Sequence, residues 1–123
     1  MSMSESQMQV LDNVADMVSV QPEATVSRTV MSTEGGNAVL FSFDEGQELS
    51  EHTAAMPAFI QVLRGRLLVK GGDDEREIDP GDLVYLPTRL PHAVKALEPS
   101  VMLLTMITAA RAADAIDGRT ERQ

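Results

Sequence analysis

The sequence contains no cysteine in its 123 residues. This absence excludes disulfide bonds, catalysis by a thiolate and zinc sites with cysteine ligands. The sequence also contains no apolar run long enough to cross a bilayer, and its polar start, MSMSESQ, lacks the apolar core of a signal peptide. We therefore expect a cytoplasmic protein that makes no contact with membranes.

Positive charge is scarce as well. Ten lysines and arginines stand against 19 aspartates and glutamates, which gives a formal net charge of −9. Such a chain repels phosphate backbones, so we expect no binding to nucleic acids and read the acidic surface as a solubility feature. The length and the 43% of apolar residues are those of a single globular domain. We expect one domain over 1–123, with its core at 24–107 and flexible ends at 1–9 and 118–123.

Short β-type segments separated by glycine and proline turns fill the middle of the chain. They are rich in β-branched and apolar residues and predict strands at 24–32, 38–44, 58–63, 67–70, 75–78, 83–86, 92–97 and 101–107. Residues 49–56 lead through His52 into a loop. The segment GGDD predicts a hairpin turn between two of these strands, and DPGD predicts another turn. Many short strands at even spacing indicate an all-β barrel or sandwich.

Two helices are expected outside the strands. Residues 11–18 place apolar side chains at helical spacing, and Asp12 or Asn13 could cap the N-terminus of that helix. Residues 108–117 have high helix propensity. We therefore expect a short N-terminal helix and a second short helix at the C-terminal end.

The two histidines occur in two related contexts. His52 lies in EGQELSEHTA, between Gly46 and the later turn glycine Gly65, and His92 lies in LPTRLPHAVKA. This order of strands, glycine turns and histidines resembles the small single-domain cupins, a family of β-barrels with two sequence motifs. The resemblance covers about residues 24–107 and implies a cupin-type double-stranded β-helix, also called a jelly-roll barrel.

The resemblance also implies a metal site that is incomplete in this chain. The family uses three histidines and one glutamate, whereas here Ala54 stands at the second histidine position and Ala58 at the glutamate position. In the second motif, Arg89 replaces a glycine and Ala96 an asparagine. Only His52 and His92 remain as metal ligands, which implies at most a weakly held divalent ion such as Zn, Fe, Ni or Mn.

Strand alternation predicts which side chains line the barrel. If His52 faces inward, Ser50 and Ala54 do so too, and Val94 and Ala96 follow His92. The predicted ligand site combines the two imidazoles with apolar side chains: Phe41, Phe43, Ile60, Met102 and Met106. Such a lining is typical of a pocket for a small, largely apolar molecule. The histidines are expected to grip a polar group of that ligand, to act as acid and base, or to bind a metal.

A third metal ligand would have to come from outside the motif. Glu48 shares strand parity with His52, and Glu51 or Gln61 could turn inward at a bulge. The thioethers of Met56, Met102 and Met106 would instead suit Cu(I). Tyr85, Arg89, Arg64 and Arg66 are weaker candidates, with core packing or solvent exposure as the simpler interpretation.

Three functions remain open at this point. The first is a non-catalytic small-molecule-binding or sensory barrel, which the alanines at the two ligand positions favour. The second is a metal-dependent enzyme of the dioxygenase or isomerase type that uses His52 and His92. The third is a structural or interaction protein with a filled barrel. We also expect a homodimer, because exposed edge strands need covering and 24–32 is a suitable partner strand for another subunit.

Overall fold

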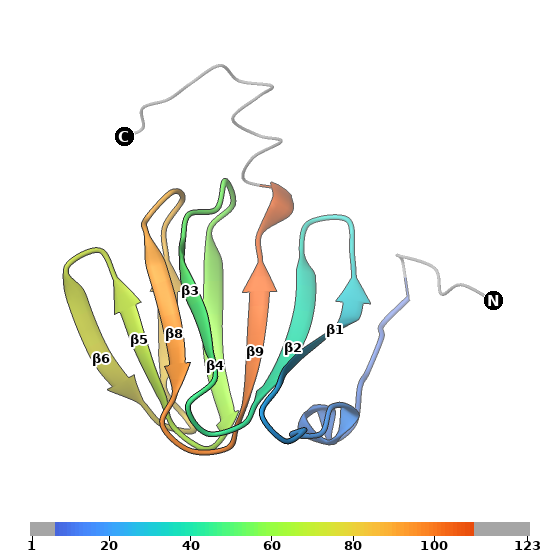
Figure 1. Cartoon of the computed structure of the whole chain (residues 1–123). Coiled ribbons are helices and arrows are strands. Elements are labelled where there is room, and N and C mark those ends of the chain that lie inside the picture. Colours follow the sequence, from blue (N-terminus) through green and yellow to red (C-terminus); the bar gives the residue numbers. More distant parts are fainter. Residues whose placement is uncertain (1–6, 110–123) are drawn as a thin grey trace.

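Two antiparallel β-sheets face each other in the computed structural model, which describes residues 7–109 (Figure 1). One sheet has five strands in the order β1-β2-β9-β4-β7, and the other has four in the order β3-β8-β5-β6. The strands are β1 (Thr25–Ser32), β2 (Asn37–Phe43), β3 (Glu48–His52), β4 (Ala58–Arg64), β5 (Leu67–Gly71), β6 (Asp74–Ile78), β7 (Leu83–Leu86), β8 (His92–Ala96) and β9 (Ser100–Met106). This arrangement confirms the predicted all-β, jelly-roll fold.

The core lies between the two sheets, because alternate residues of each strand point to the same face. On β4, Ile60 and Val62 are almost fully buried, and on β8 Val94 and Ala96 are buried opposite them. Leu67 completes this set from β5. Full burial of one such aliphatic side chain contributes about 1.5–3 kcal/mol, so this core supplies much of the stability.

The N-terminal segment covers the outer face of the five-stranded sheet. Its 3-10 helix η1 (Val14–Met17) is followed by Val18, which joins Leu40 and Val101 in a second cluster. The predicted helix is therefore in the right place, but it is a single 3-10 turn. Asn13 precedes it in a left-handed conformation and makes no capping hydrogen bond with its side chain, so the predicted cap is wrong.

Most of the predictions for the two ends of the chain concern residues outside 7–109. The helix predicted at 108–117 and the flexible ends predicted at 1–9 and 118–123 lie outside the described residues, apart from a few positions at their borders. Within 7–109, no helix is both long enough and apolar enough to cross a membrane.

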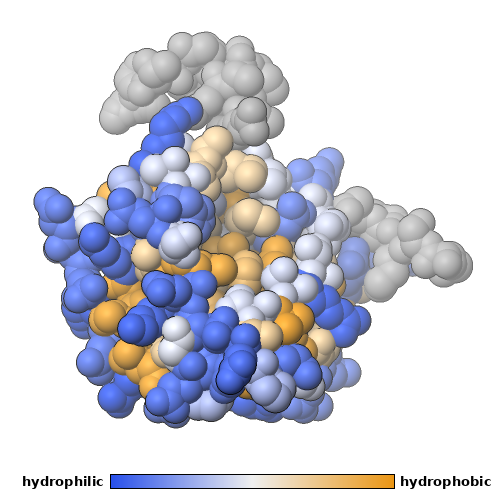
Figure 2. Space-filling model, viewed as in Figure 1, coloured by the Kyte–Doolittle hydropathy of each residue, from blue (hydrophilic) through white to orange (hydrophobic). Residues whose placement is uncertain are grey.

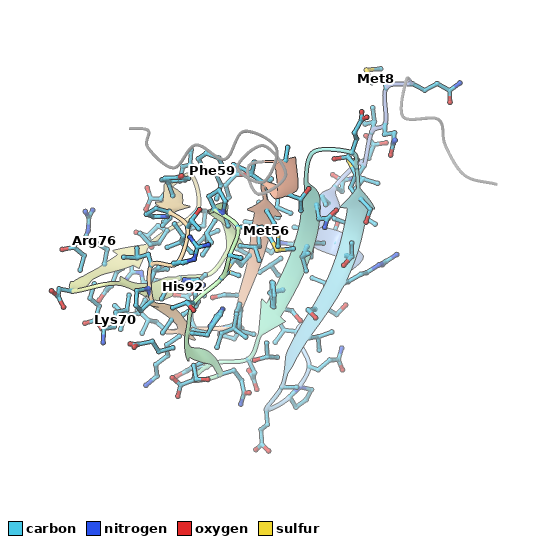
Figure 3. All side chains as sticks on the ribbon, turned by 90° about the horizontal axis from the view of Figure 1, so that it is seen from above. Met8, Met56, Phe59, Lys70, Arg76 and His92 are labelled. Atoms are coloured by element: carbon cyan, nitrogen blue, oxygen red, sulfur yellow. The ribbon has the colours of Figure 1, made fainter. Side chains whose placement is uncertain are left out.

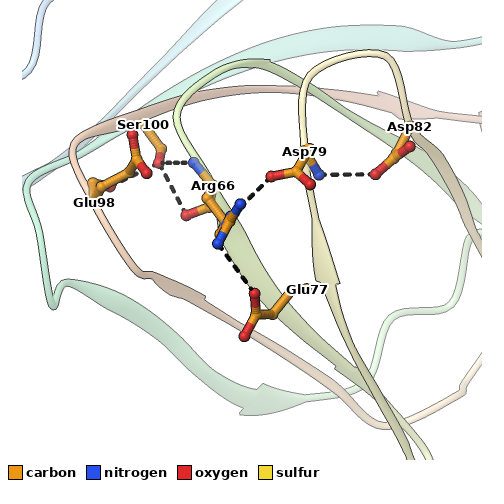
Figure 4. A network of polar contacts seen from close by, with 6 residues as sticks. All are labelled: Arg66, Glu77, Asp79, Asp82, Glu98 and Ser100. Carbon is orange, nitrogen blue, oxygen red and sulfur yellow. Dashed lines mark hydrogen bonds and ion pairs between the residues drawn. The ribbon is translucent and has the colours of Figure 1, made fainter.

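A polar network fastens the turns at one end of the barrel (Figure 4). The Arg66 guanidinium donates to Asp79 at 2.9 Å and to Glu77 at 3.4 Å, and the Asp79 N–H donates to the Asp82 carboxylate at 2.8 Å. The hydrogen bond with Asp79 raises the pKa of Arg66 above its already high value. The buried Ser100 hydroxyl accepts the backbone N–H of Arg66 at 3.0 Å, which ties β5 to β9.

Candidate functional site

His52 and His92 face each other across the β3–β8 pair. They are register partners in the antiparallel ladder, and their ring centroids lie 4.3 Å apart at an interplanar angle of 65°. His52 ends β3 and is exposed, whereas His92 begins β8 and is half-buried. Two positions that are 40 residues apart in sequence therefore form one imidazole pair at the rim of the barrel.

Both rings are oriented by the same backbone contact. The Nδ1 of His52 lies 2.8 Å from the carbonyl oxygen of Ser50, and the Nδ1 of His92 lies 2.8 Å from that of Leu90. A carbonyl oxygen can only accept, so each Nδ1 carries the proton and donates it. In the neutral rings each Nε2 then has a free lone pair, and neither Nε2 is hydrogen-bonded to any described residue. The pair is thus held ready to accept hydrogen bonds or to bind a metal ion.

A bulge in β3 changes which of its side chains face the core. The register shifts between Leu49, paired with Val94, and His52, paired with His92. Leu49 is half-buried and packs against the core, while Ser50 is exposed. The prediction that Ser50 faces inward with His52 is therefore wrong. The extra residue of the bulge lets Leu49 and His52, three positions apart, lie on the same face.

His92 faces the space between the sheets, because it alternates with the core residues Val94 and Ala96. Figure 3, a view from above, shows it between the two layers. Hydrophobic side chains gather in the middle of the face shown in Figure 2, over the region between β3 and β9, with hydrophilic ones around them. Apolar side chains are therefore exposed on this face of the molecule.

The apolar residues predicted to line the ligand site all point toward this interior. Phe43, Ile60 and Met102 are buried in the inter-sheet core, and Phe41 packs against it with its ring 6.0 Å from that of Phe43. Met106 is half-buried at the end of β9, where it pairs with Ala58. Whether these side chains contact a ligand stays a prediction.

In the described part of the chain, the two histidines have no third histidine or carboxylate beside them that would complete a metal site. Among residues 7–109, no group of three histidines, aspartates or glutamates is close enough to hold an ion. Glu48 is exposed and pairs with Lys95, Glu51 lies 3.3 Å from the ammonium group of Lys70, and Gln61 is exposed on β4. The protonated Nδ1 and free Nε2 of both rings suit metal binding, but a third protein ligand is missing.

The weaker candidates lie away from the histidine pair or face solvent. Arg64 and Arg66 are exposed and form ion pairs, Arg64 with Asp16. Tyr85 is 53% exposed, so the expectation of core packing is wrong for it. Arg89 is exposed with a φ of 64°, a left-handed conformation that the glycine of the motif would adopt without strain.

Sequence reasoning missed three contributions to this site. The Ser50 and Leu90 carbonyl groups that orient the rings act through the backbone, which leaves no trace in side-chain chemistry. Leu49 was missed because of the bulge. One signal was present for it, since an apolar residue among the polar neighbours of ELSEH indicates an inward position.

Comparisons with known proteins give one family. The sequence profile described as "Cupin domain" matches residues 39–108, more than half of the chain. The structure resembles a conserved protein of unknown function from Streptococcus pyogenes, at 24% identity and a TM-score of 0.75, covering 88% of this chain and 96% of that one. An RmlC-like cupin protein from Desulfovibrio desulfuricans has 27% identity and a TM-score of 0.73, covering 82% and 98%. No curated protein matches the sequence.

Proposed function

The chain belongs to the cupin family, and from that premise we propose that its barrel binds a small, largely apolar molecule between the two sheets. The observation that carries this proposal is the imidazole pair with both Nδ1–H groups held by backbone carbonyls. In this state the two Nε2 atoms are acceptors at the rim of an apolar interior. A ligand with an O–H or N–H group would donate to them while its apolar part packs toward Phe41 and Met106.

The donor set favours an organic ligand over a tightly bound metal ion. Two imidazoles leave most of the coordination shell of a divalent ion to water, and within residues 7–109 no third histidine or carboxylate lies close enough to join them. An apolar interior binds an apolar ligand without any such requirement, and one or two polar groups are enough to orient it. A barrel that binds such a molecule without converting it would serve as a sensor or a carrier.

Binding of simple alcohols tests this proposal. Phenol and cyclohexanol, titrated into ¹⁵N-labelled protein, are expected to shift the Nε2 resonances of both histidines. His52→Ala and His92→Ala should each weaken binding. Ser50→Ala is the matched control, because it keeps the backbone carbonyl that orients His52. Shifts that avoid the histidines, or binding that survives both substitutions, would show that the ligand does not use the pair.

A second candidate is a metal-dependent cupin enzyme of the dioxygenase or isomerase type. The tautomer of the two rings favours it, because a metal-binding histidine usually donates its other N–H to a carbonyl or carboxylate oxygen. His52 and His92 would then hold a divalent ion, with water in the remaining positions. Elemental analysis of protein purified without an affinity tag distinguishes the candidates: one bound ion per chain would favour the enzyme.

A further inference from the structure

A pocket opens on the side of the barrel between β6 and β7. These are the terminal strands of their sheets, and no ladder hydrogen bonds join them. The pocket between them has a volume of about 380 Å³ and does not include either histidine among its lining residues. Its size lies at the lower end of the range for small-molecule sites, which is roughly 300–1,000 Å³.

The inner walls of this side pocket are aliphatic. Val69, Ile78 and Leu86 reach it from the core, and Val84 and Leu90 are half-buried beside them. They come from three strands and one loop, so a ligand would be enclosed by both sheets. The pocket therefore suits a branched or straight aliphatic group.

The rim of the side pocket carries unpaired charges of both signs. Asp74 and Arg76 both line it, and they lie two residues apart on β6, so they share one face. Neither side chain forms an ion pair or hydrogen bond with a described residue. Figure 3 shows Arg76 and Lys70 on opposite sides of the β5–β6 hairpin. The remaining charge, Asp82, already accepts the Asp79 N–H at 2.8 Å.

We propose that the side pocket binds a small aliphatic α-amino acid. Its carboxylate would pair with Arg76, its ammonium group with Asp74, and its side chain would pack on the aliphatic wall. A zwitterion satisfies both free charges at once, whereas a plain carboxylate would meet the field of Asp74 and Asp82, and a plain amine would meet that of Arg76. Neither histidine lines this site, although Gly71 is the register partner of His92 and the Leu90 carbonyl orients its ring. Leucine binding depends on Arg76 and Asp74, whereas the histidine proposal needs neither, so either proposal can fail without the other.

Strands β6 and β7 border the pocket, so their amide resonances make this inference directly measurable. Tyr85 lines the side pocket as part of β7, but its ring packs against Phe59, 5.2 Å away between ring centroids, so the amide resonances of β6 and β7 are the main readout and tyrosine fluorescence is a secondary one. L-Leucine is the probe. Isocaproate and isoamylamine keep its isobutyl group but lack the ammonium group or the carboxylate, respectively. Leucine is expected to bind with a Kd of ~1 mM or below, and each comparator at least ~10-fold more weakly.

Three substitutions on the β5–β6 hairpin separate a specific site from general surface effects. Arg76→Gln and Asp74→Asn should each weaken leucine binding by about tenfold, since each removes one charge-assisted contact. All three side chains are exposed, so the variants should fold. Lys70→Gln, on the opposite side of the hairpin, is the matched control and should leave binding unchanged.

Several outcomes would overturn the proposal. Isocaproate or isoamylamine binding as tightly as leucine would mean that only one charge is recognised. Equal binding by wild type and both charge variants would place leucine elsewhere. If ~10 mM leucine leaves the amide resonances of β6 and β7 unchanged, the side pocket does not bind amino acids.

Discussion

Gly46 and Gly65 adopt nearly the same left-handed backbone conformation, with φ angles of 84° and 85°, but in different surroundings. A Cβ at Gly46 would meet nothing within 4 Å, whereas one at Gly65 would lie 2.2 Å from the Ser100 Oγ and 2.4 Å from the Pro99 carbonyl oxygen. Gly65→Ala therefore adds a steric clash to backbone strain. Gly46→Ala adds the strain alone.

We expect the two substitutions to differ clearly in cost. Gly46→Ala should destabilise the fold by about 1 kcal/mol, the usual penalty for a side chain in this conformation. Gly65→Ala should cost about 3 kcal/mol or more, because the buried Ser100 and its contacts must also move. Urea unfolding of both variants measures the difference. Equal losses of stability would contradict the crowding described for Gly65.

Single residues also mark the limit of what the sequence could predict about the site. The two histidines could be paired from the sequence, because each sits in its own motif-like context. The sequence could not predict which neighbours of His52 face the core. Counting alternate residues assumes a regular strand, and the bulge in β3 adds one residue. Arg89 shows a similar limit, because its positive φ is set by the loop and not by its own preference.

At the scale of elements, Asp44 connects the N-terminal segment to the end of β2. Its carboxylate accepts the backbone N–H of Glu23 at 2.7 Å and that of Glu45 at 2.9 Å. These two hydrogen bonds hold the pKa of Asp44 below its ordinary value of 3.8, and the bond from Glu23 has the larger effect. The carboxylate therefore stabilises the fold above that value, and the contribution is lost as the pH falls through the lowered pKa.

This contact gives a pH-dependent expectation. Asp44→Asn keeps only one acceptor oxygen, so it should lower the urea midpoint at neutral pH. The difference from wild type should shrink once the pH falls below the ordinary carboxylate value of 3.8. Asp73→Asn, in the exposed β5–β6 loop, is the control. A deficit of Asp44→Asn that stays constant down to the lowest pH would show that the charge is not responsible.

The elements themselves could largely be predicted, because short β-branched segments between glycine and proline turns admit little else. All eight predicted strands occur, with ends that differ by a few residues, and β3 forms in addition from residues expected to lead into a loop. The helix predicted at 11–18 shortened to a 3-10 turn, since the segment must lie flat on Leu40 and Val101. The spacing of apolar residues in 11–18 indicates that the segment has an apolar face. It carries no information about the sheet surface on which that face packs.

At the scale of the whole molecule, four strands form sheet edges within the described part of the chain: β1, β3, β6 and β7. β6 and β3 carry several charges and β7 is only four residues long, so these three are protected against pairing. β1 is eight residues long and holds a single charged residue, Arg28. We therefore expect β1 to pair with a second copy and form a homodimer.

Sedimentation at micromolar concentration measures the assembly. The expected result is a species of twice the chain mass of 13.3 kDa. A species of 13.3 kDa alone would contradict the dimer.

The side pocket is a property of the whole molecule that the sequence did not reveal. The pocket lies between β6 and β7, which are edge strands of different sheets. The order of strands in each sheet depends on contacts between segments that are distant in sequence. Nothing local in the sequence places Leu90 and Val84 beside Asp74, Arg76 and Asp82. The sheet topology places these charged residues at the rim of the pocket.

The most direct test of the central claim is a calorimetric titration of the wild-type protein with Zn²⁺. The claim is that His52 and His92 act as a pair of acceptors without a third protein ligand, so wild type should bind Zn²⁺ only weakly. Restoring the missing groups by Ala54→His with Ala58→Glu should raise the affinity strongly, although the larger side chains will cost ~1–3 kcal/mol of overpacking. Tight binding of one Zn²⁺ per wild-type chain would contradict the account and favour the metal-dependent enzyme.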